Sequence, residues 1–281
     1  MKQFTQQDLK RLWRPEDNSQ GEDNGQIIII GGSELFTGAP PMSLIAASRL
    51  VDMVFVATPE GDKEIVQKVA LFSKLRSVIW ISRESLDEYV AKSDAILIGP
   101  GLMRYHKQLS DSNTFDDSGT ETRMLTKYLV QKFPDKKWVI DGGSLQTMEP
   151  EWIPRGSIVT PNTHEFEILF KAQNSVEKAQ EMALKYQCVI VIKAPVAYVT
   201  DGTDTYEIDG GNAGLTKGGT GDVLAGIIVG LLAKNDALLA AAAGTYVIKK
   251  TAEHLAKRVG TNFNADDVAE NVFEVMQTMV R

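Results

Sequence analysis

Six uninterrupted apolar runs, rich in isoleucine and valine, constrain the fold of this chain more than any other feature. Strands that are exposed on one face alternate apolar and polar residues, whereas strands covered on both faces are apolar throughout. The runs therefore predict a mostly parallel sheet with helices on both of its faces. They lie at residues 26–31, 53–57, 78–81, 94–99, 138–141 and 188–193.

Segments with the apolar spacing of a helix separate several of these runs. Repetition of strand and helix along the chain is typical of an α/β protein. The fold class that we predict is therefore α/β. The predicted helical segments are residues 40–50, 120–133 and 165–187.

The pattern changes after the last run. Residues 197–208, AYVTDGTDTYEI, predict a hairpin that closes the sheet with antiparallel edge strands. From Gly221 onward the chain is predicted to be helical, with long helices at 223–233 and 237–259. Asn235 and Asp236 precede the second of these and can cap it.

The chain has 281 residues and no linker rich in Pro, Gly or Ser divides it. We predict one catalytic domain over residues 26–281, preceded by a polar N-terminal arm over residues 1–25. Two long polar loops are expected at 17–25 and 108–122, either as lids or as insertions without a role.

Composition excludes several classes of function. A formal net charge of −7 argues against binding of DNA or RNA through the phosphate backbone. The single cysteine, Cys188, cannot form an internal disulfide framework. The longest apolar run, residues 223–233, is too short to span a bilayer as a helix, so we expect a soluble cytoplasmic protein.

The stretch NAGLTKGGTGDVLAG at residues 212–226 carries the strongest signal for function. Gly218, Gly219 and Gly221 permit a close backbone approach to a ligand, and they precede a helix whose first amide groups have no internal partner. Such an end binds anions. Asp222 would serve there as a general base toward a hydroxyl that attacks a phosphoryl group; the alternative is an acid that only stabilises the helix start.

Five ordered motifs identify a family resemblance that covers nearly the whole chain. The sequence resembles the ADP- or ATP-dependent NAD(P)H-hydrate dehydratases of the ribokinase-like superfamily, which implies a three-layer α/β/α sandwich with a mostly parallel central sheet. The motifs are IIIIGGSELFTGAP, ILIGPGL, TPNTHEF, VIVIK and NAGLTKGGTGDVLAG.

The resemblance implies a repair reaction. The ring hydroxyl of hydrated NADH or NADPH would be phosphorylated by ADP or ATP with Mg²⁺, and elimination of phosphate would restore the dihydronicotinamide. Asp222 would deprotonate the hydroxyl, while Gly219, Thr220 and Gly221 would hold the phosphoryl group.

The resemblance also implies a division of the site. The residues expected at the hydrate are Ala39, Gly101, Asn162 and Asp222. The further residues expected at the nucleotide are Lys193, Ala194, Pro195, Val196, Ala197 and Asn212.

Two acids are candidates for a metal site. Asp141 follows a predicted strand, where it would help to hold Mg²⁺ or cap the next turn. Glu165 would organise the metal through water or simply open a helix. Lys193 would touch phosphates, or it would be an ordinary solvated lysine.

Several positions depart from the family pattern, chiefly on the hydrate side. Asn162 stands where many members have His, and Met103 where they have Gly. The usual DADAL reads DGGSL from Asp141 to Leu145, and Ala194 follows Lys193 in place of Gly. The tripeptide SQG, residues 19–21, replaces a frequent HKG.

Two other functions remain open at this stage. One is a small-molecule hydroxyl kinase of the same superfamily, and the other is a nucleotide-binding regulator without catalysis. The resemblance further implies a homo-oligomer and a separate NAD(P)H-hydrate epimerase as functional partner, because the residues before IIIIGG are too few to supply one.

Overall fold

The computed structural model describes residues 1–58, 78–105 and 117–280. Within them, ten strands form one sheet in the order β1-β10-β9-β8-β7-β6-β5-β2-β3-β4. The strands from β8 to β4 in this order are parallel, and β9 is antiparallel to both of its neighbours. Their bounds are β1 Lys2–Gln3, β2 Gln26–Ile30, β3 Met53–Ala57, β4 Val78–Trp80, β5 Ala95–Ile98, β6 Lys137–Ile140, β7 Ile158–Val159, β8 Val189–Ile192, β9 Ala197–Thr200 and β10 Thr205–Ile208.

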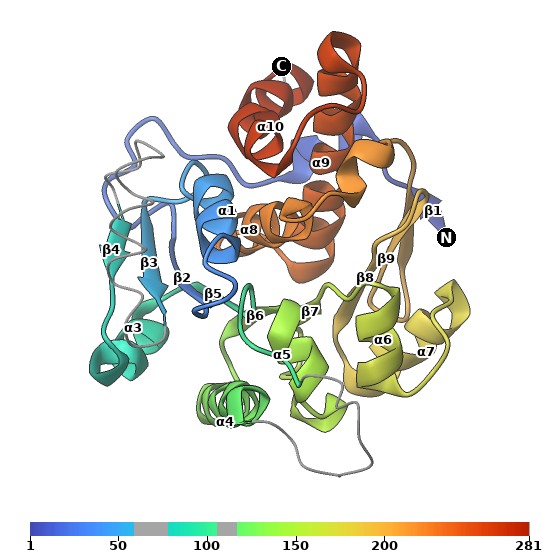
Figure 1. Ribbon diagram of the computed structural model, residues 1–281. Coiled ribbons are helices and arrows are strands. Elements are labelled where there is room, and N and C mark those ends of the chain that lie inside the picture. Colours follow the sequence, from blue (N-terminus) through green and yellow to red (C-terminus); the bar gives the residue numbers. More distant parts are fainter. Residues whose placement is uncertain (59–77, 106–116, 281) are drawn as a thin grey trace.

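Both faces of the sheet are covered, as the apolar runs predict. In β2, Ile27 and Ile29 belong to one buried cluster, whereas Ile28 and Ile30 belong to the other. Because successive side chains of a strand point to opposite faces, each run supplies two cores at once. The arrangement is the three-layer α/β/α sandwich expected from the sequence (Figure 1).

The helices divide between the two faces (Figure 1). One layer contains α1 Ala39–Ala47, α8 Thr220–Leu232, α9 Ala237–Val259 and α10 Ala265–Val280. The other contains α3 Leu86–Lys92, α4 Asp117–Lys132, α5 Gly142–Thr147, α6 Thr163–Phe170 and α7 Val176–Tyr186. The short 3₁₀ helices are η1 Gln6–Arg11, η2 Arg83–Ser85, η3 Pro150–Trp152 and η4 Ala213–Thr216.

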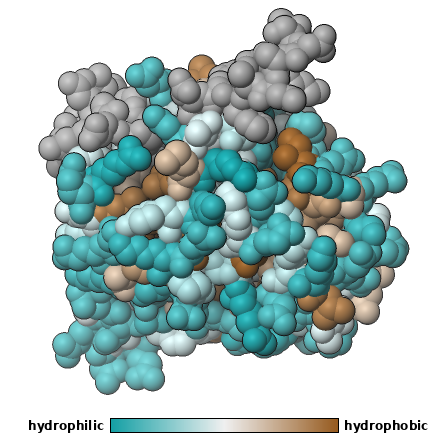
Figure 2. Space-filling model, turned by 90° about the horizontal axis from the view of Figure 1, so that it is seen from below, coloured by the Kyte–Doolittle hydropathy of each residue, from teal (hydrophilic) through white to brown (hydrophobic). Residues whose placement is uncertain are grey.

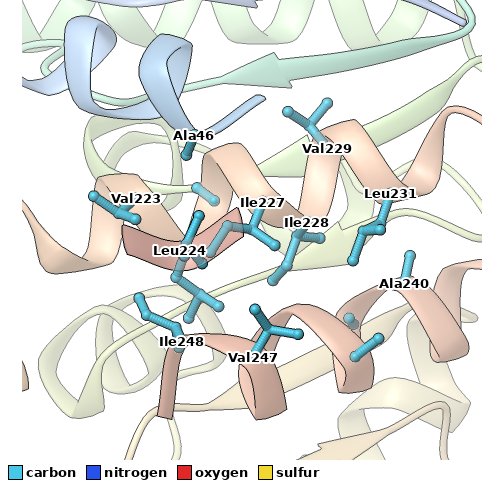
Figure 3. Close-up of a cluster of buried hydrophobic side chains, with 14 of the residues drawn as sticks. Ala46, Val223, Leu224, Ile227, Ile228, Val229, Leu231, Ala240, Val247 and Ile248 are labelled. Atoms are coloured by element: carbon cyan, nitrogen blue, oxygen red, sulfur yellow. The ribbon is translucent and has the colours of Figure 1, made fainter. Parts of the chain in front are cut away.

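Helix α8 is buried between α1 and α9, and apolar side chains project from it on both sides (Figure 3). Its glycines allow the close contact with α1. A methyl group on Gly226 would overlap the backbone of Ser43, and one on Gly230 would lie 2.9 Å from Leu50 Cβ. The Ser43 hydroxyl donates to the Asp222 carbonyl oxygen at 2.8 Å, so α1 also fixes the first turn of α8.

The expected polar arm is wrong for the first twelve residues. Strand β1 pairs with β10, and the Phe4 amide continues the ladder to the Glu207 carbonyl oxygen at 2.9 Å. The side chains of Phe4, Leu9 and Leu12 are buried in the core. These residues are part of the folded domain, and they make β1 rather than β10 the edge strand.

Two further expectations need correction. The helix predicted over 165–187 is two helices, because Lys171 ends α6 in the left-handed conformation and Ser175 caps α7. Helix α4 begins at Asp117, within the predicted loop 108–122; the part of that loop up to residue 116 lies outside the described residues. The hairpin at 197–208 and the Asp236 cap of α9 are confirmed.

The face seen from below in Figure 1 is mostly hydrophilic, with hydrophobic residues in separate patches (Figure 2). Among the described residues, every helix is too short or too polar to cross a membrane.

Candidate active site

The glycine loop ends where α8 begins. Gly219 precedes the helix with φ of +90°, a conformation that favours glycine, and a methyl group there would lie 2.8 Å from Ala265 Cβ. The Thr220 hydroxyl is turned into the loop, within hydrogen-bonding distance of the Leu215 and Lys217 carbonyl oxygens at 2.7 and 2.8 Å. Helix-start amides without an internal partner can bind an anion, and among those here the Thr220 amide already donates to the Lys217 carbonyl oxygen at 3.4 Å.

Lys217 does not serve that anion site. Its ammonium donates to the carbonyl oxygens of Thr261 and Phe263, which ties the glycine loop to the start of α10. The cation beside the helix start is Lys193, at the end of β8. A methyl group on Gly221 would lie 3.6 Å from Lys193 Nζ.

Lys193 lies near three carboxyl groups from different elements. They belong to Asp141, Glu165 and Asp222. Lys193 Nζ donates to Asp141 Oδ1 at 3.1 Å, and the Thr160 hydroxyl donates to the same oxygen at 2.7 Å. Asp141 is buried and its side chain makes no cap to α5, which excludes the simple capping alternative. Lys193 is likewise not a solvated lysine, because it is partly buried in this ion pair.

Glu165 has both of its carboxylate oxygens engaged. Oε2 accepts from the backbone amide of Asn162 at 2.8 Å, and Oε1 accepts from Gln146 Nε2 at 3.2 Å. In return Asn162 Oδ1 accepts from the Glu165 amide at 3.0 Å, so the two residues form a capping box at the start of α6. Glu165 thus opens a helix, as one alternative held, and also faces the ion pair of Asp141.

The electrostatics of this group single out Asp222. Burial, reinforced by the charge of Asp141 and opposed by that of Lys193, raises the pKa of the Asp222 carboxyl to about 7. Burial likewise raises the pKa of Glu165. Burial alone would lower the pKa of Lys193, but Asp141 and Glu165 outweigh it and hold the ammonium charged. A carboxyl that titrates near neutral pH suits proton transfer.

The carboxylate oxygens of this group suit a hard cation that a bound nucleotide holds for the most part. Three carboxyl groups face one lysine, so the pocket has an excess of negative charge and oxygen donors, which Mg²⁺ prefers. Across the described ranges, however, His, Cys, Asp and Glu side chains form no group of three that could hold an ion. Asp141 and Glu165 therefore offer carboxylate oxygens to a cation but do not form a complete ion site by themselves.

Three of the residues expected at the nucleotide directly follow Lys193 and are exposed, whereas Ala197 and Asn212 have other surroundings. Ala194, Pro195 and Val196 form the exposed connection between β8 and β9, with 38% of Val196 exposed. Ala197 is a correction, because its side chain is buried in the core within β9. Asn212 acts on the chain itself: its Oδ1 accepts from the Gly214 amide and its Nδ2 donates to the Ala252 carbonyl oxygen.

Two of the residues expected at the hydrate, Ala39 and Gly101, lie together in the segments that follow β2 and β5. Gly101 has φ of +71°, and a methyl group there would overlap the Phe36 carbonyl oxygen and lie 3.2 Å from Ala39 Cβ. Ala39 and Gly101 are thus neighbours, as expected. Asn162 lies at the start of α6 with its side chain on the surface.

The loops after β2 and β5 and the start of α5 are packed backbone against backbone. A methyl group on Gly31 would overlap the carbonyl oxygen of Pro100, and one on Gly99 would overlap that of Asp141. A methyl group on Gly143 would likewise overlap the carbonyl oxygen of Leu102. The sequence DGGSL therefore has a structural reason: its second glycine admits the GPGL loop, whose Gly99 accepts from the Gly143 amide at 3.1 Å.

A cavity of about 360 Å³ continues from these segments, past the ends of β2 and β3, to residues of η2, α3 and α4. Its lining is partly apolar, with Leu35, Leu102 and Met103, and includes the guanidinium-bearing Arg83. Met103, which replaces a glycine of the family pattern, therefore faces this space.

Sequence analysis missed the residues that orient the acids. Thr160 and Gln146 hydrogen-bond Asp141 and Glu165, and Ser43 holds the first turn of α8. Thr160 lies inside the TPNTHEF motif, so its place at a strand end was a usable signal. Gln146 and Ser43 carried none, because their partners are distant in the sequence.

The fold and the site define an α/β protein of the ribokinase-like kind, with a carboxylate at the anion-binding start of a helix. A ribokinase-like superfamily protein from Enterococcus faecalis has a similar fold, with a TM-score of 0.83 and 21% identity over 99% of this chain and 96% of that one. The chain belongs to the NAD(P)H-hydrate dehydratase family, whose model matches residues 27–273.

Curated relatives of two lengths are similar to this chain. The ADP-dependent (S)-NAD(P)H-hydrate dehydratase of Cenarchaeum symbiosum is 30% identical over 280 residues, which are 95% of this chain and 93% of that protein. The bifunctional NAD(P)H-hydrate repair enzyme of Methanocaldococcus jannaschii is 30% identical over 275 residues, 96% of this chain but 52% of the relative. The chain spans about half the length of such bifunctional relatives.

One solved structure of the family was obtained with nucleotide. The ADP/ATP-dependent NAD(P)H-hydrate dehydratase of Bacillus subtilis, co-crystallized with ATP and Mg²⁺, has a TM-score of 0.75 and 20% identity, covering 99% of this chain and 98% of that one. At this identity the likeness concerns the fold.

Proposed function

We propose that this protein dehydrates hydrated NADH or NADPH in a nucleotide-dependent reaction. The observation that carries the proposal is the Asp222 carboxyl, with a pKa raised to about 7, at the anion-binding start of α8 beside Lys193. Membership of the dehydratase family supports this choice of substrate.

In the first step the ring hydroxyl of the hydrate attacks the terminal phosphorus of ADP or ATP. Asp222 accepts the hydroxyl proton as the new O–P bond forms and the bond to the leaving phosphate oxygen breaks. The amides of Gly219, Thr220 and Gly221, with the Lys193 ammonium, neutralise the charge on the transferred phosphoryl oxygens. The Thr220 hydroxyl has a different task and keeps the loop in shape.

In the second step the ring carbon–oxygen bond breaks and phosphate leaves with the electron pair. Water or the departing phosphate accepts a proton from the neighbouring ring carbon, and the electron pair of that C–H bond forms the double bond of the dihydronicotinamide. Phosphorylation makes this step possible because phosphate is a far better leaving group than hydroxide.

Mg²⁺, when bound to the nucleotide phosphates, would reduce their charge and so favour attack. Asp141 and Glu165 would hold it through water, since Asp141 Oδ1 and both oxygens of Glu165 already accept hydrogen bonds. Thr160 and Gln146 keep these acids in place.

The two substrates would lie along the carboxyl edge of the sheet. The nucleotide would rest on the connection of Ala194, Pro195 and Val196, whose apolar side chains are exposed. The hydrate would lie over Ala39 and Gly101 near Asn162, with the rest of the dinucleotide toward the cavity at Met103. Full-length relatives are named for ADP and for the (S) hydrate, which favours that pair here.

We further propose a hydrate epimerase as functional partner, because relatives of about twice this length are named bifunctional repair enzymes. A homo-oligomer in the cytoplasm is part of the same proposal. The buried Cys188, whose pKa burial raises to about 12, is an unreactive thiol and fits a reducing compartment.

The test mixes purified protein with Mg²⁺, hydrated NADH and either ADP or ATP, and follows the return of dihydronicotinamide absorbance. Nucleotide-dependent recovery that is lost in Asp222→Asn and on removal of Mg²⁺ by a chelator is the expected result. A phosphorylated hydrate that accumulates without elimination would indicate a kinase instead. Nucleotide binding without any turnover would indicate a regulator.

A further inference from the structure

Lys249 is a buried lysine of α9 that the proposed reaction leaves without a role. Its side chain lies under two loops, with 5% of the residue exposed. Its Nζ donates to the carbonyl oxygens of Ala194 at 3.1 Å, Pro195 at 2.6 Å and Gly210 at 2.9 Å. Two of these carbonyl groups belong to the connection between β8 and β9, and the third precedes η4.

The three carbonyl oxygens match the charged form of the lysine. An ammonium has three N–H donors and no acceptor, whereas a neutral amine has only two donors. Burial lowers the pKa of Lys249 and Lys250 lowers it further, while Asp209 and Glu253 oppose this shift. Hydrogen bonds from an ammonium are about twice as strong as those between neutral groups. Lys249 therefore fastens both loops to α9.

Neighbouring residues of α9 hold the same stretch of chain. Glu253 accepts from the Gly211 amide at 3.0 Å, and the Ala252 carbonyl oxygen accepts from Asn212 Nδ2 at 2.8 Å. Among these contacts, Lys249 alone also reaches the connection between β8 and β9. It thus sets the position of the Ala194–Val196 segment relative to the loop that leads to Asp222.

We propose that Lys249 is a positioning residue that shapes the nucleotide-binding surface at residues 194–196 without touching the nucleotide. The proposal rests on the nucleotide site put forward above. Loss of the ammonium would leave three carbonyl groups without their shared donor, and the exposed connection would sample other positions. Binding of the nucleotide would then have to restore the order that Lys249 now supplies.

The test is Lys249→Met, which keeps the length of the side chain and removes its charge and donors. We expect the KM for ADP and the Kd of ADP from calorimetry to rise at least about tenfold, since one hydrogen bond to a charged group contributes that much. We expect kcat at saturating ADP to change less than about threefold. Lys257→Met removes an exposed lysine of the same helix and should leave all three values unchanged.

Chemical rescue separates positioning from damage to the fold. Propylammonium should restore ADP affinity to Lys249→Ala, because it can occupy the vacated space and donate to the three carbonyl groups. Tetramethylammonium, which has no N–H donor, should not. Wild-type ADP affinity in Lys249→Met, or a loss confined to kcat, would overturn the inference, as would a lack of rescue in a variant with wild-type circular dichroism.

Failure of the proposed reaction would be distinguishable from failure of the inference about Lys249. If wild-type protein binds ADP but restores no hydrated NADH, the calorimetric comparison of Lys249→Met with Lys257→Met still decides the role of Lys249.

Discussion

Replacement of Asp222 by Asn should stabilise the fold at the same time as it abolishes catalysis. A group whose pKa is higher in the folded state than in the unfolded state makes the folded state less stable as pH rises. The ordinary pKa of an aspartate is 3.8, and burial raises that of Asp222 to about 7. The native protein should therefore lose stability from this group between about pH 4 and pH 7, and the loss should be constant above pH 7.

The magnitude follows from the shift itself. One pKa unit corresponds to about 1.4 kcal/mol, so the full cost above pH 7 is about 4 kcal/mol. At pH 5 only about 1.5 kcal/mol of this cost is present, because pH 5 is only about one unit above the ordinary pKa at which the cost begins. The Asn variant has no such titration. Its advantage over the native protein should therefore be about 2 to 3 kcal/mol larger at pH 8 than at pH 5.

Urea unfolding of both proteins at pH 5 and pH 8 measures how the gap between their free energies of unfolding changes with pH. Effects of the substitution that do not depend on pH, such as a changed fit of the side chain, cancel in the comparison. In the activity assay, kcat of the variant should fall by about 10²- to 10⁴-fold, and the native pH–rate profile should rise through about pH 7. An equal stability gap at both pH values would refute a raised pKa for Asp222.

Three other substitutions test parts of the structure. Lys193→Met should reduce kcat/KM by about 10²-fold or more and shift the rise of the pH–rate profile to higher pH, because the ammonium lowers the pKa of the catalytic carboxyl; an unshifted profile would count against this ion pair. Gly226→Ala should cost about 1 to 3 kcal/mol in urea unfolding, because the methyl group overlaps Ser43, whereas Gly21→Ala, which meets open space, should be neutral. Phe4→Ala should cost about 3 to 5 kcal/mol in the same assay if the first residues belong to the core, and nothing if they form an arm.

The sequence was sufficient for six of the parallel strands, because each apolar run encodes burial on both faces, but not for β7, which has only two residues. It failed at the N-terminus, where β1 has two residues and η1 is a 3₁₀ helix. Neither element is long enough to show a period, so Phe4 and Leu9 were not recognised as core residues. The split of the 165–187 helix was readable in principle, since Ser175 is a typical N-cap.

Within the site, the sequence could single out Asp222 and Lys193 as candidates but not what surrounds them. A motif names the residue types at a loop, whereas the raised pKa of Asp222 arises from burial and from Asp141, which is distant in the sequence. Lys249 was invisible for the same reason. Its three partners lie on two loops, and an apolar helix pattern does not reveal a lysine that faces inward.

The packing of backbone against backbone at Gly31, Gly99 and Gly143 has a mechanical consequence. Because no side chain separates them, we expect the loops after β2 and β5 and the start of α5 to move together. Asp141 is the N-cap of α5 and Gly101 belongs to the loop after β5, so a shift on the hydrate side would carry with it the acid that faces Asp222. The hydrate side and the acids of the phosphoryl-transfer side would then keep the same alignment relative to each other.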